Sequence, residues 1–272
     1  DALDAADAIM TTDQWPKVRR VALSTGASVV GIAKGAGMIE PNMATMLSVL
    51  LTDATVPRPV LQRALARAVN ARGSFNSCSV DSDTSTSDAV VVLASNEVAG
   101  DDDAAGVAEL TDALTAVCQQ LAGDVVRNGE GVSHVLRVAV ERAPSDALAR
   151  AIGKGVANSP LVKCAVAAND ANIGRIACAL GKAAMHAQYD ELDASALRVR
   201  IGGELVLEHG AFVADARTDA RLAAHFEHAR LAHDAPPNTG VLFPPHERCV
   251  DIVVDLGSSG AGAAAPPPPP PE

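Results

Sequence analysis

The feature that most constrains this chain is a glycine-containing loop that runs directly into a long apolar segment. Residues 34–45 read KGAGMIEPNMAT, and MLSVLLTD follows. Gly35 and Gly37 permit backbone conformations that other residues avoid, and the apolar segment has the composition of a buried strand. One hydroxyl residue, Thr45, stands immediately before it. The sequence therefore predicts a strand preceded by a side chain that is well placed to act as a nucleophile.

Thr45 needs a base to act in this way, because a threonine hydroxyl is a weak nucleophile at its ordinary pKa. Cleavage of the peptide bond between Ala44 and Thr45 would supply that base as a new α-amine. Such an amine has an ordinary pKa of roughly 7.7–8 and can accept a proton near pH 7. The alternative interpretation is that Thr45 is only a β-branched residue at the start of a strand. The residues alone favour this alternative.

The chain as a whole predicts alternating helices and strands, and therefore an α/β fold. It has 272 residues, enough for one or two domains, and is 48% hydrophobic but only 2% aromatic, so its core must be aliphatic. Periodicity predicts helices at residues 1–10, 57–72, 110–124, 145–156, 174–183 and 217–232. It predicts hairpins at 18–33 and 197–210, paired strands at 75–80 and 90–95, further strands at 46–51, 136–140 and 249–256, and an extended segment at 159–168. The first helix shows no capping signal before it, so we expect the chain to begin inside a longer protein.

Charge and hydropathy exclude several classes of partner. The formal net charge is −11, which argues against binding to nucleic acid or to an anionic membrane. No stretch approaches 18 consecutive apolar residues and no signal peptide opens the chain. We therefore expect a soluble protein.

The cysteines and histidines do not have the spacing of a metal site. An odd number of cysteines without a CxxC pair argues against a disulfide framework and against zinc, and predicts a reducing compartment. We expect small core residues at Cys78, Cys118, Cys164, Cys178 and Cys249. His225 and His228 lie three apart on a predicted helix, but no further ligand has a suitable spacing, so we expect surface side chains and no metal.

The glycine loop has two further interpretations. Gly31, Gly35 and Gly37 lack the GxGxxG spacing of a dinucleotide site, and an apolar strand follows where such a site has a helix. The sequence therefore does not favour nucleotide binding. Lys34 is either a solvated cation or a charge that binds the carboxylate of an amino-acid substrate.

Five segments together resemble one protein family. GIAKGAGMIEPNMATMLSVLLTDA is similar to the self-cleavage region of the bifunctional ornithine acetyltransferase family of arginine biosynthesis, also called glutamate N-acetyltransferase. AIMTTDQWPK, FNSCSVDSDTSTSDAVVVLAS, NGEGVSH and NSPLVKCAV resemble other segments of that family in the same order. The resemblance covers most of residues 1–257. It implies a layered α/β sandwich, similar in style to the N-terminal-nucleophile hydrolases.

The resemblance also implies a mechanism and a set of site residues. Thr45 attacks the carbonyl carbon of Ala44, and hydrolysis of the resulting ester separates two subunits. Thr45 then takes an acetyl group from N-acetylornithine and passes it to glutamate through an acetyl-threonine intermediate. Thr11, Lys34 and Glu130 bind substrate, Lys34 at the carboxylate and Glu130 at the ammonium group. No metal or organic cofactor is implied, and acetyl-CoA is a further acetyl donor in some members.

The same resemblance implies how the chain is organised. Residues 1–44 correspond to the C-terminal part of the first (alpha) subunit and residues 45–257 to the second (beta) subunit. Residues 258–272 are expected to form a disordered Gly/Ala/Pro tail. Two copies of each subunit form a heterotetramer. The implied location is the cytoplasm in a bacterium, or the chloroplast stroma or mitochondrial matrix in a eukaryote.

Some features depart from the family pattern and leave alternatives open. Residues 170–175 read DANIGR where the family has DPNWGR, and the family's oxyanion segment and C-terminal substrate residues have no counterpart. Without the resemblance, Thr11 would be a helix-boundary hydroxyl and Glu130 an ordinary exposed side chain. The alternative functions are an N-terminal-nucleophile aminopeptidase or amidohydrolase, and a truncated, non-catalytic remnant of the family.

Overall fold

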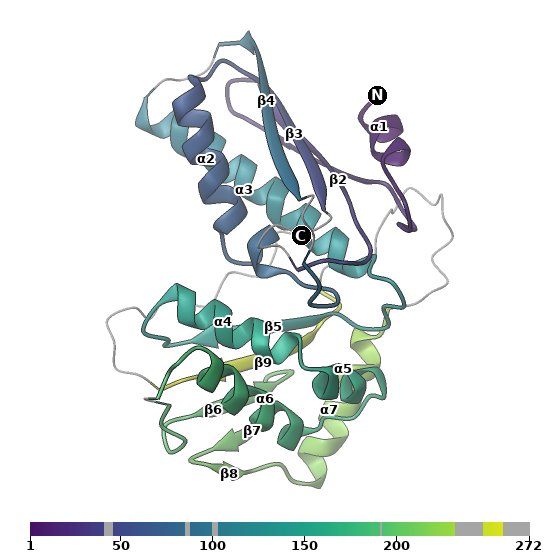
Figure 1. Ribbon diagram of the computed structural model, residues 1–272, viewed down its shortest axis with the longest axis vertical. Coiled ribbons are helices and arrows are strands. Elements are labelled where there is room, and N and C mark those ends of the chain that lie inside the picture. The colour runs from purple at the N-terminus through teal and green to yellow at the C-terminus, as the bar shows by residue number, and fades with distance from the viewer. Residues whose placement is uncertain (41–45, 85–87, 100–102, 191, 232–246, 258–272) are drawn as a thin grey trace. The chain divides into compact units, whose positions relative to one another are not determined.

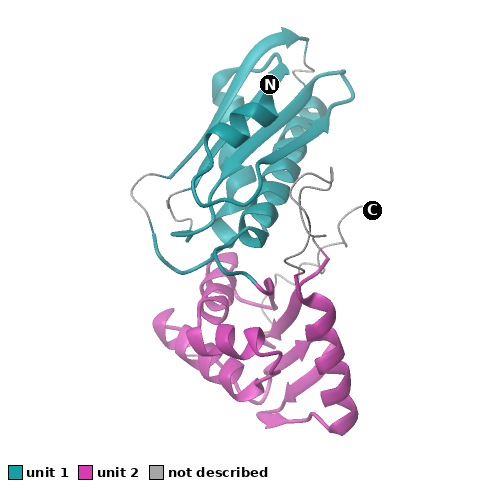
Figure 2. Cartoon of the chain, turned by 90° about the vertical axis from the view of Figure 1, so that its right-hand side faces the viewer, with its two compact units in different colours: residues 1–132, 235–243 teal, residues 133–234, 244–272 magenta. Residues whose placement is uncertain are grey.

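The chain divides into two compact units, shown in different colours in Figure 2. The computed structural model describes residues 1–40, 46–84, 88–99, 103–190, 192–231 and 247–257. Unit 1 contains the described part of residues 1–132, and unit 2 contains the described residues from 133 onward. This boundary differs from the predicted division at residues 44 and 45. The predicted subunits stay a prediction, because a cleavage site can lie inside a folded unit.

Unit 1 is built on a four-stranded sheet whose strands follow the order of the chain. Neighbouring strands are antiparallel except for the last pair, β3 and β4, which is parallel. The strands are β1 (Lys17–Ala22), β2 (Ser28–Lys34), β3 (Leu47–Ala54) and β4 (Ala89–Val98). Gly26 closes the predicted hairpin between β1 and β2 with a φ of 87°, which a residue with a side chain rarely adopts. The predicted strands of this region are thus confirmed, with one exception described below.

Two helices cover one face of this sheet, as Figure 1 shows. α3 (Ala104–Arg127) packs along β1 and β2, and α2 (Arg58–Asn70) packs beside α3. The shared core is aliphatic, as the composition predicted, with Phe75 as its aromatic member. α3 packs closely against β2 at Gly31, because a Cβ there would lie only 2.5 Å from Cγ1 of Val117 on α3. Odd-numbered residues of β2 therefore face α3, and Lys34 faces the other way.

The opposite face of the unit 1 sheet is partly open. α1 (Ala2–Ala8) lies on this face against β1 and β2 (Figures 1 and 2). On β3 and β4 the outward side chains are apolar and partly exposed: Leu47, Leu51, Val91 and Leu93. The prediction that the first helix lacks a capping signal is wrong. Asp1 forms a capping box with Asp4, accepting hydrogen bonds from the N–H groups of Leu3 and Asp4.

Unit 2 is built on a five-stranded mixed sheet in the order β5-β9-β6-β7-β8. Only β5 and β9 run parallel to each other. The strands are β5 (Leu136–Glu141), β6 (Arg198–Ile201), β7 (Glu204–Glu208), β8 (Ala211–Phe212) and β9 (Val250–Asp255). The chain turns from β6 to β7 through two glycines with positive φ, Gly202 and Gly203, as predicted.

Four helices pack on the unit 2 sheet and share its core. They are α4 (Asp146–Ala157), α5 (Pro160–Ala167), α6 (Ile173–His186) and α7 (Ala216–Ala229). Each begins at a residue that caps its first turn: Ser145, Ser159, Asn172 and Asp215. Among the helices that the structure describes, none has both the length and the apolar character needed to cross a membrane.

Two predicted elements are wrong. Residues 159–168 were expected to be extended, but they form α5, because Ser159 caps a helix with Pro160 in its first turn. Residues 75–80 were expected to pair with β4. Instead, Phe75–Ser77 form the short 3₁₀ helix η1, and β4 pairs with β3. Short apolar runs do not distinguish a strand from a helix by periodicity alone, and both errors have this cause.

Two groups of side chains also differ from expectation. Cys118 and Cys249 are buried core residues, whereas Cys164 and Cys178 are exposed on α5 and α6. None of the five, all of which are described, forms a disulfide. His228 is exposed as predicted, but His225 is half-buried and its Nε2 accepts a hydrogen bond from Asp251 N. Within the described residues, no group of His, Cys, Asp and Glu side chains has the arrangement of a metal site.

Candidate functional site

The candidate site lies at the end of the unit 1 sheet where β2 ends and β3 begins. Lys34 is the last residue of β2 and Leu47 the first residue of β3, and the two are register partners. The KGAGM loop (residues 34–38) therefore leaves β2 beside the residue at which the chain enters β3. Ala44 and Thr45, the predicted cleavage site and nucleophile, lie outside the described residues. The described residues on either side of residues 41–45 define the candidate site.

Lys34 presents a nearly buried positive charge at this end of the sheet. Its side chain leaves the residue only 8% exposed, and Nζ donates a 3.4 Å hydrogen bond to Oγ1 of Thr11. Among the described residues, Lys34 forms no salt bridge. Removing an ammonium group from water is costly unless an anion accompanies it. This arrangement favours the second interpretation of Lys34, as the binding partner of a ligand carboxylate.

Glu130 is connected to the same place through the residue that follows Thr11. Thr12 Oγ1 donates to Glu130 Oε1 at 2.7 Å, and the N–H of Glu130 donates to the carbonyl of Ala36 at 2.8 Å. A Cβ on Gly37 would lie 2.9 Å from the Glu130 carboxyl group, so a larger residue there would require the Glu130 side chain to shift.

The structure thus gathers Thr11, Lys34 and Glu130, which we call the Thr11–Lys34–Glu130 cluster. It offers an ammonium group, a hydroxyl and an exposed carboxylate from three separate segments of the chain. Such a set is complementary to a zwitterion, whose carboxylate and ammonium group need partners of opposite charge. Their roles in binding substrate stay predictions.

The residue after Thr45 is held firmly by the start of β4. Met46 is 1% exposed, its N–H donates to Asp88 Oδ1 at 2.6 Å, and its carbonyl accepts from Ala89 N at 3.1 Å. Burial raises the pKa of Asp88, and the Met46 N–H and the Lys34 charge oppose this rise. Sequence analysis did not single out Asp88. A carboxylate directly before a predicted strand, in the family-like DTSTSD string, was the available signal.

The polar segment before β4 also supports the KGAGM loop. Both carboxylate oxygens of Asp81 accept backbone hydrogen bonds, from Met38 N and from Ile39 N. Val80 N donates to the carbonyl of Ile39 at 2.7 Å. Met38 has a φ of 56°, which is uncommon for a residue with a side chain. Val80 and Asp81 thus bond to the loop at the place where the sequence predicted pairing with β4.

A buried ion pair that sequence analysis missed lies behind the cluster. Lys17 Nζ and Asp13 Oδ1 are 2.5 Å apart, and both side chains are 0% exposed. Burial by itself raises the pKa of Asp13, but hydrogen bonds from Lys17 and from Gly35 N outweigh it and hold the pKa below its ordinary value. Burial lowers the pKa of Lys17, and Asp13 opposes this effect. The i,i+4 spacing of the two residues was a weak signal, because it crosses from the TTD segment into β1.

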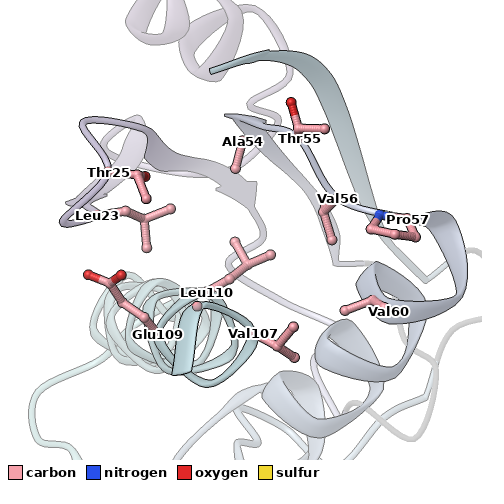
Figure 3. Close-up of a pocket in the computed structure, with 11 residues that line it drawn as sticks. Leu23, Thr25, Ala54, Thr55, Val56, Pro57, Val60, Val107, Glu109 and Leu110 are labelled. Atoms are coloured by element: carbon pink, nitrogen blue, oxygen red, sulfur yellow. The ribbon is translucent and has the colours of Figure 1, made fainter. Parts of the chain in front are cut away.

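A cavity of about 240 Å³ lies elsewhere in unit 1 (Figure 3). It is lined by the ends of β1 and β3 and the first turns of α2 and α3, mainly with apolar side chains. Glu109, a charged residue in its lining, accepts hydrogen bonds from the N–H and the hydroxyl of Ser24. Ala22 and Thr52 both pair with the start of β2, so this cavity is at the opposite end of the sheet from Lys34. It is not part of the candidate site.

The DANIGR segment lies in unit 2, at the start of α6. Asn172 Oδ1 accepts from Arg175 N at 3.1 Å, and Asn172 Nδ2 donates to Asp170. Arg175 also donates to the carbonyl of Leu161 at 3.0 Å. The segment therefore caps α6 and ties it to α5 without the Pro and Trp of the family pattern.

Comparison with known proteins identifies the family. The chain matches the ArgJ family over residues 1–264. This chain belongs to the ArgJ family. It is 44% identical over 231 residues to the arginine biosynthesis bifunctional protein ArgJ of Gluconobacter oxydans, covering 82% of this chain and 53% of that protein. It is 50% identical over 185 residues to the protein of the same name from Methylococcus capsulatus, covering 66% of this chain and 45% of that protein.

A solved structure supports the same conclusion. The arginine biosynthesis bifunctional protein argJ of Bacillus halodurans aligns with a TM-score of 0.61 and 28% identity, covering 78% of this chain and 89% of that chain. The predicted layered α/β fold of this family is thereby confirmed. The ArgJ-family chain spans about half the length of the curated relatives it matches.

Proposed function

We propose that this ArgJ-family chain belongs to a self-cleaving acetyltransferase that moves an acetyl group from N-acetylornithine to glutamate in arginine biosynthesis. The observation that carries the proposal is the nearly buried ammonium group of Lys34 beside Thr11, which has no salt-bridge partner among the described residues, at the end of the sheet where Thr45 precedes β3. Family membership supports the reaction, and the geometry supports an amino-acid substrate. Acetyl-CoA as a further acetyl donor and the absence of a metal or organic cofactor are part of the same proposal.

The reaction proceeds in two stages. In the first, the Thr45 hydroxyl oxygen attacks the carbonyl carbon of Ala44, the peptide C–N bond breaks, and water hydrolyses the ester to leave a free α-amine on Thr45. In the second, that amine takes the hydroxyl proton while the oxygen attacks the acetyl carbon of N-acetylornithine. Ornithine leaves with the proton on its nitrogen. The amine of glutamate then attacks the acetyl-threonine ester and regenerates the hydroxyl.

The positions around Thr45 suit this sequence of steps. Asp88 and Ala89 fix both peptide groups of Met46, so the backbone immediately after the nucleophile is anchored. Lys34 binds the α-carboxylate of either substrate, and Glu130 binds the ammonium group. Both substrates share the carboxylate, which is why one cluster serves both halves of a ping-pong cycle.

The organisation of the complete protein is proposed on the same basis. Residues up to 44 belong to an alpha subunit and residues from 45 to a beta subunit, two of each forming a heterotetramer. The relatives reported above come from bacteria, which supports the cytoplasm over a chloroplast or a mitochondrion. The rival aminopeptidase, amidohydrolase and remnant functions are not favoured by the family match over residues 1–264.

An intact-mass measurement tests the proposal. We expect the protein expressed from its complete coding sequence to give two fragments that meet at Ala44 and Thr45. Thr45→Val, which keeps the shape and removes the hydroxyl, should stay uncut, whereas Thr45→Ser should still cleave. The cleaved protein should transfer labelled acetyl from N-acetylornithine to glutamate. An uncut wild-type chain contradicts the proposal, and release of free acetate without acetylglutamate favours the amidohydrolase.

A further inference from the structure

The Thr11–Lys34–Glu130 cluster is assembled from three segments that have no covalent connection near the site. They are the turn before β1, the loop after β2 and the end of α3. Within the part of the chain that the structure describes, the members of the cluster are joined by a 3.4 Å bond between Lys34 and Thr11 and by the bond from Thr12 to Glu130. Binding geometry to within a fraction of an ångström requires a more rigid support.

The buried pair of Asp13 and Lys17 bonds to all three segments. Asp13 Oδ2 accepts from the N–H of Thr11 at 3.2 Å, and Asp13 Oδ1 accepts from the N–H of Gly35 at 2.7 Å. Gly35 directly follows Lys34. Lys17 Nζ donates to Asn128 Oδ1 at 2.7 Å, two residues before Glu130.

Asn128 completes the connection between the turn and the end of α3. It is 1% exposed, and its Oδ1 also accepts from the N–H of Gln14 at 3.0 Å. Two donors on one oxygen fix the orientation of the amide. The anchored residues Thr11, Gly35 and Asn128 thus lie at, or within two residues of, a member of the Thr11–Lys34–Glu130 cluster.

A role in stability alone does not account for this pair. Taking both charges out of water costs about as much as their attraction returns, and apolar residues of similar volume often serve folding equally well. Hydrogen bonds between charged groups are short and directional, so they can fix the distance between the segments that they join. Lys17 and Lys34 also lie on opposite faces of the sheet, so the pair acts on the cluster through the backbone of residues 34–36.

We propose that Asp13, Lys17 and Asn128 are positioning residues that set the spacing of the Thr11–Lys34–Glu130 cluster and thereby its affinity for amino-acid substrates. This inference rests on the proposed function of that cluster. Asp13 holds the Thr11 and Gly35 backbones together, and Lys17 fixes the end of α3 against them. None of the three contacts the substrate.

The test uses the double variant Asp13→Asn/Lys17→Met, in the protein expressed from its complete coding sequence. Removing both charges avoids a lone buried charge, so the variant should fold. We expect KM for glutamate and for N-acetylornithine to rise at least tenfold, while kcat changes much less. Hydrogen exchange should become faster in peptides that contain residues 34–36 and 128–130.

Asp124→Asn is the matched control. It removes the charge of an equally buried carboxylate, which accepts two hydrogen bonds from Arg19. Asp124 acts on Lys17 through its charge, and the substitution keeps the backbone bond from Asn128 N to the Asp124 carbonyl. We expect its KM values to stay within twofold of wild type, and any faster exchange to extend through unit 1 instead of centring on residues 34–36 and 128–130. Equal changes in both variants would show a general loss of stability and overturn the proposal. So would unchanged KM and exchange in the double variant.

The two proposals can fail separately. If the wild-type protein transfers no acetyl group, the proposed function is wrong. The exchange of residues 34–36 and 128–130 then decides the positioning role alone, because it needs no substrate. Protection that survives in the double variant overturns that role. Protection lost at these residues more than in the rest of unit 1, a pattern that Asp124→Asn lacks, supports it.

Discussion

The two units of this chain differ in where they place charge. In unit 1, the side chains of Asp13 and Asp124 are 0% exposed, and each is bonded to a cation. In unit 2, the comparable Arg137–Asp251 pair has side chains that are 48% and 34% exposed. Histidine follows the opposite distribution: none of the seven lies before residue 133. Unit 1 thus contains paired carboxylates with no exposed side-chain surface. Unit 2 contains the histidines and more exposed pairs, although Asp255, paired with Arg142, is only 11% exposed.

This difference indicates which unit is built to hold geometry. A surface ion pair contributes little, because water and salt screen it and the side chains remain mobile. A buried pair must keep its partners in place, since either charge alone would be very unfavourable there. The candidate site lies in the unit with the buried pairs. Three predictions test this contrast.

The largest expected effect comes from breaking one bidentate Arg–Asp pair in each unit. Asp124 accepts from Arg19 Nε and Nη2, both at 2.6 Å, and Asp251 accepts in the same manner from Arg137. Asp124→Asn should lower the free energy of unfolding by about 3 kcal/mol, because it leaves the Arg19 charge without its buried partner. Asp251→Asn should cost less than about 1 kcal/mol.

Urea unfolding measures both variants. Trp15 is the one tryptophan of the chain and lies in unit 1, so its fluorescence follows that unit, and hydrogen exchange follows unit 2. High salt should weaken the Asp251 pair and leave the Asp124 pair nearly unaffected. Similar costs for the two variants would remove the proposed distinction between the units.

Packing at glycine gives a second, smaller contrast. A Cβ on Gly155 of α4 would lie 2.4 Å from the Cβ of Ala183 on α6, which cannot rotate away. A Cβ on Gly31 would meet the ends of the Val117, Leu50 and Leu121 side chains, and these can shift. Both alanine variants should be destabilised by about 1–3 kcal/mol, with Gly155→Ala the more severe.

Gly181→Ala is the control within α6, because no atom lies within 4 Å of its Cβ position. It should stabilise unit 2 by up to about 1 kcal/mol, since glycine is a poor helix former. Thermal unfolding of Gly155→Ala, Gly31→Ala and Gly181→Ala ranks the three variants by stability. A greater loss in Gly31→Ala than in Gly155→Ala would mean that the unit 1 core is the less adaptable of the two.

The elements of both units were predictable where periodicity extended over many residues. α3, α6 and the β1–β2 hairpin repeat an apolar spacing that only one secondary structure satisfies. The errors fell on short segments. α5 depends on Ser159 as a cap, and η1 is closed by hydrogen bonds from Ser77 N to the carbonyl of Ser74 and from Cys78 N to the carbonyl of Phe75. Neither cause is visible in hydrophobic spacing.

The candidate site was predictable only in part, for a similar reason. Thr11, Lys34 and Glu130 came from the resemblance, since each alone reads as an ordinary surface or boundary residue. Asp13 and Lys17 were missed because the residue type alone does not predict that a charged side chain is buried. Their burial depends on the pairing of β1 with β2 and on the position of the end of α3. Tertiary contacts from distant segments decide which polar residues become a site.

The smallest expected effect concerns pH and unit 2. Burial lowers the pKa of His225 below its ordinary value of 6.5, Asp251 opposes this, and His228 and Arg137 add to it. The neutral ring also accepts a hydrogen bond from Asp251 N, which protonation of Nε2 would break. The unfolded chain therefore binds a proton at a higher pH than the folded one. The stability of unit 2 should be complete above pH 6.5 and decrease as the pH falls from 6.5 towards the lower folded pKa.

His225→Gln isolates this contribution, because glutamine can accept the same hydrogen bond and does not titrate. The difference in hydrogen exchange between wild type and variant, taken at each pH for peptides of α7 and β9, cancels the intrinsic pH dependence of exchange. The wild type should lose protection relative to the variant between pH 6.5 and 5, and peptides of unit 1 should show no such difference. His134 has a lowered pKa for the same main reason, burial, and remains in both proteins. If the two proteins lose protection equally, His134 or another group carries the pH dependence, and if unit 1 peptides respond as well, the two units do not unfold separately.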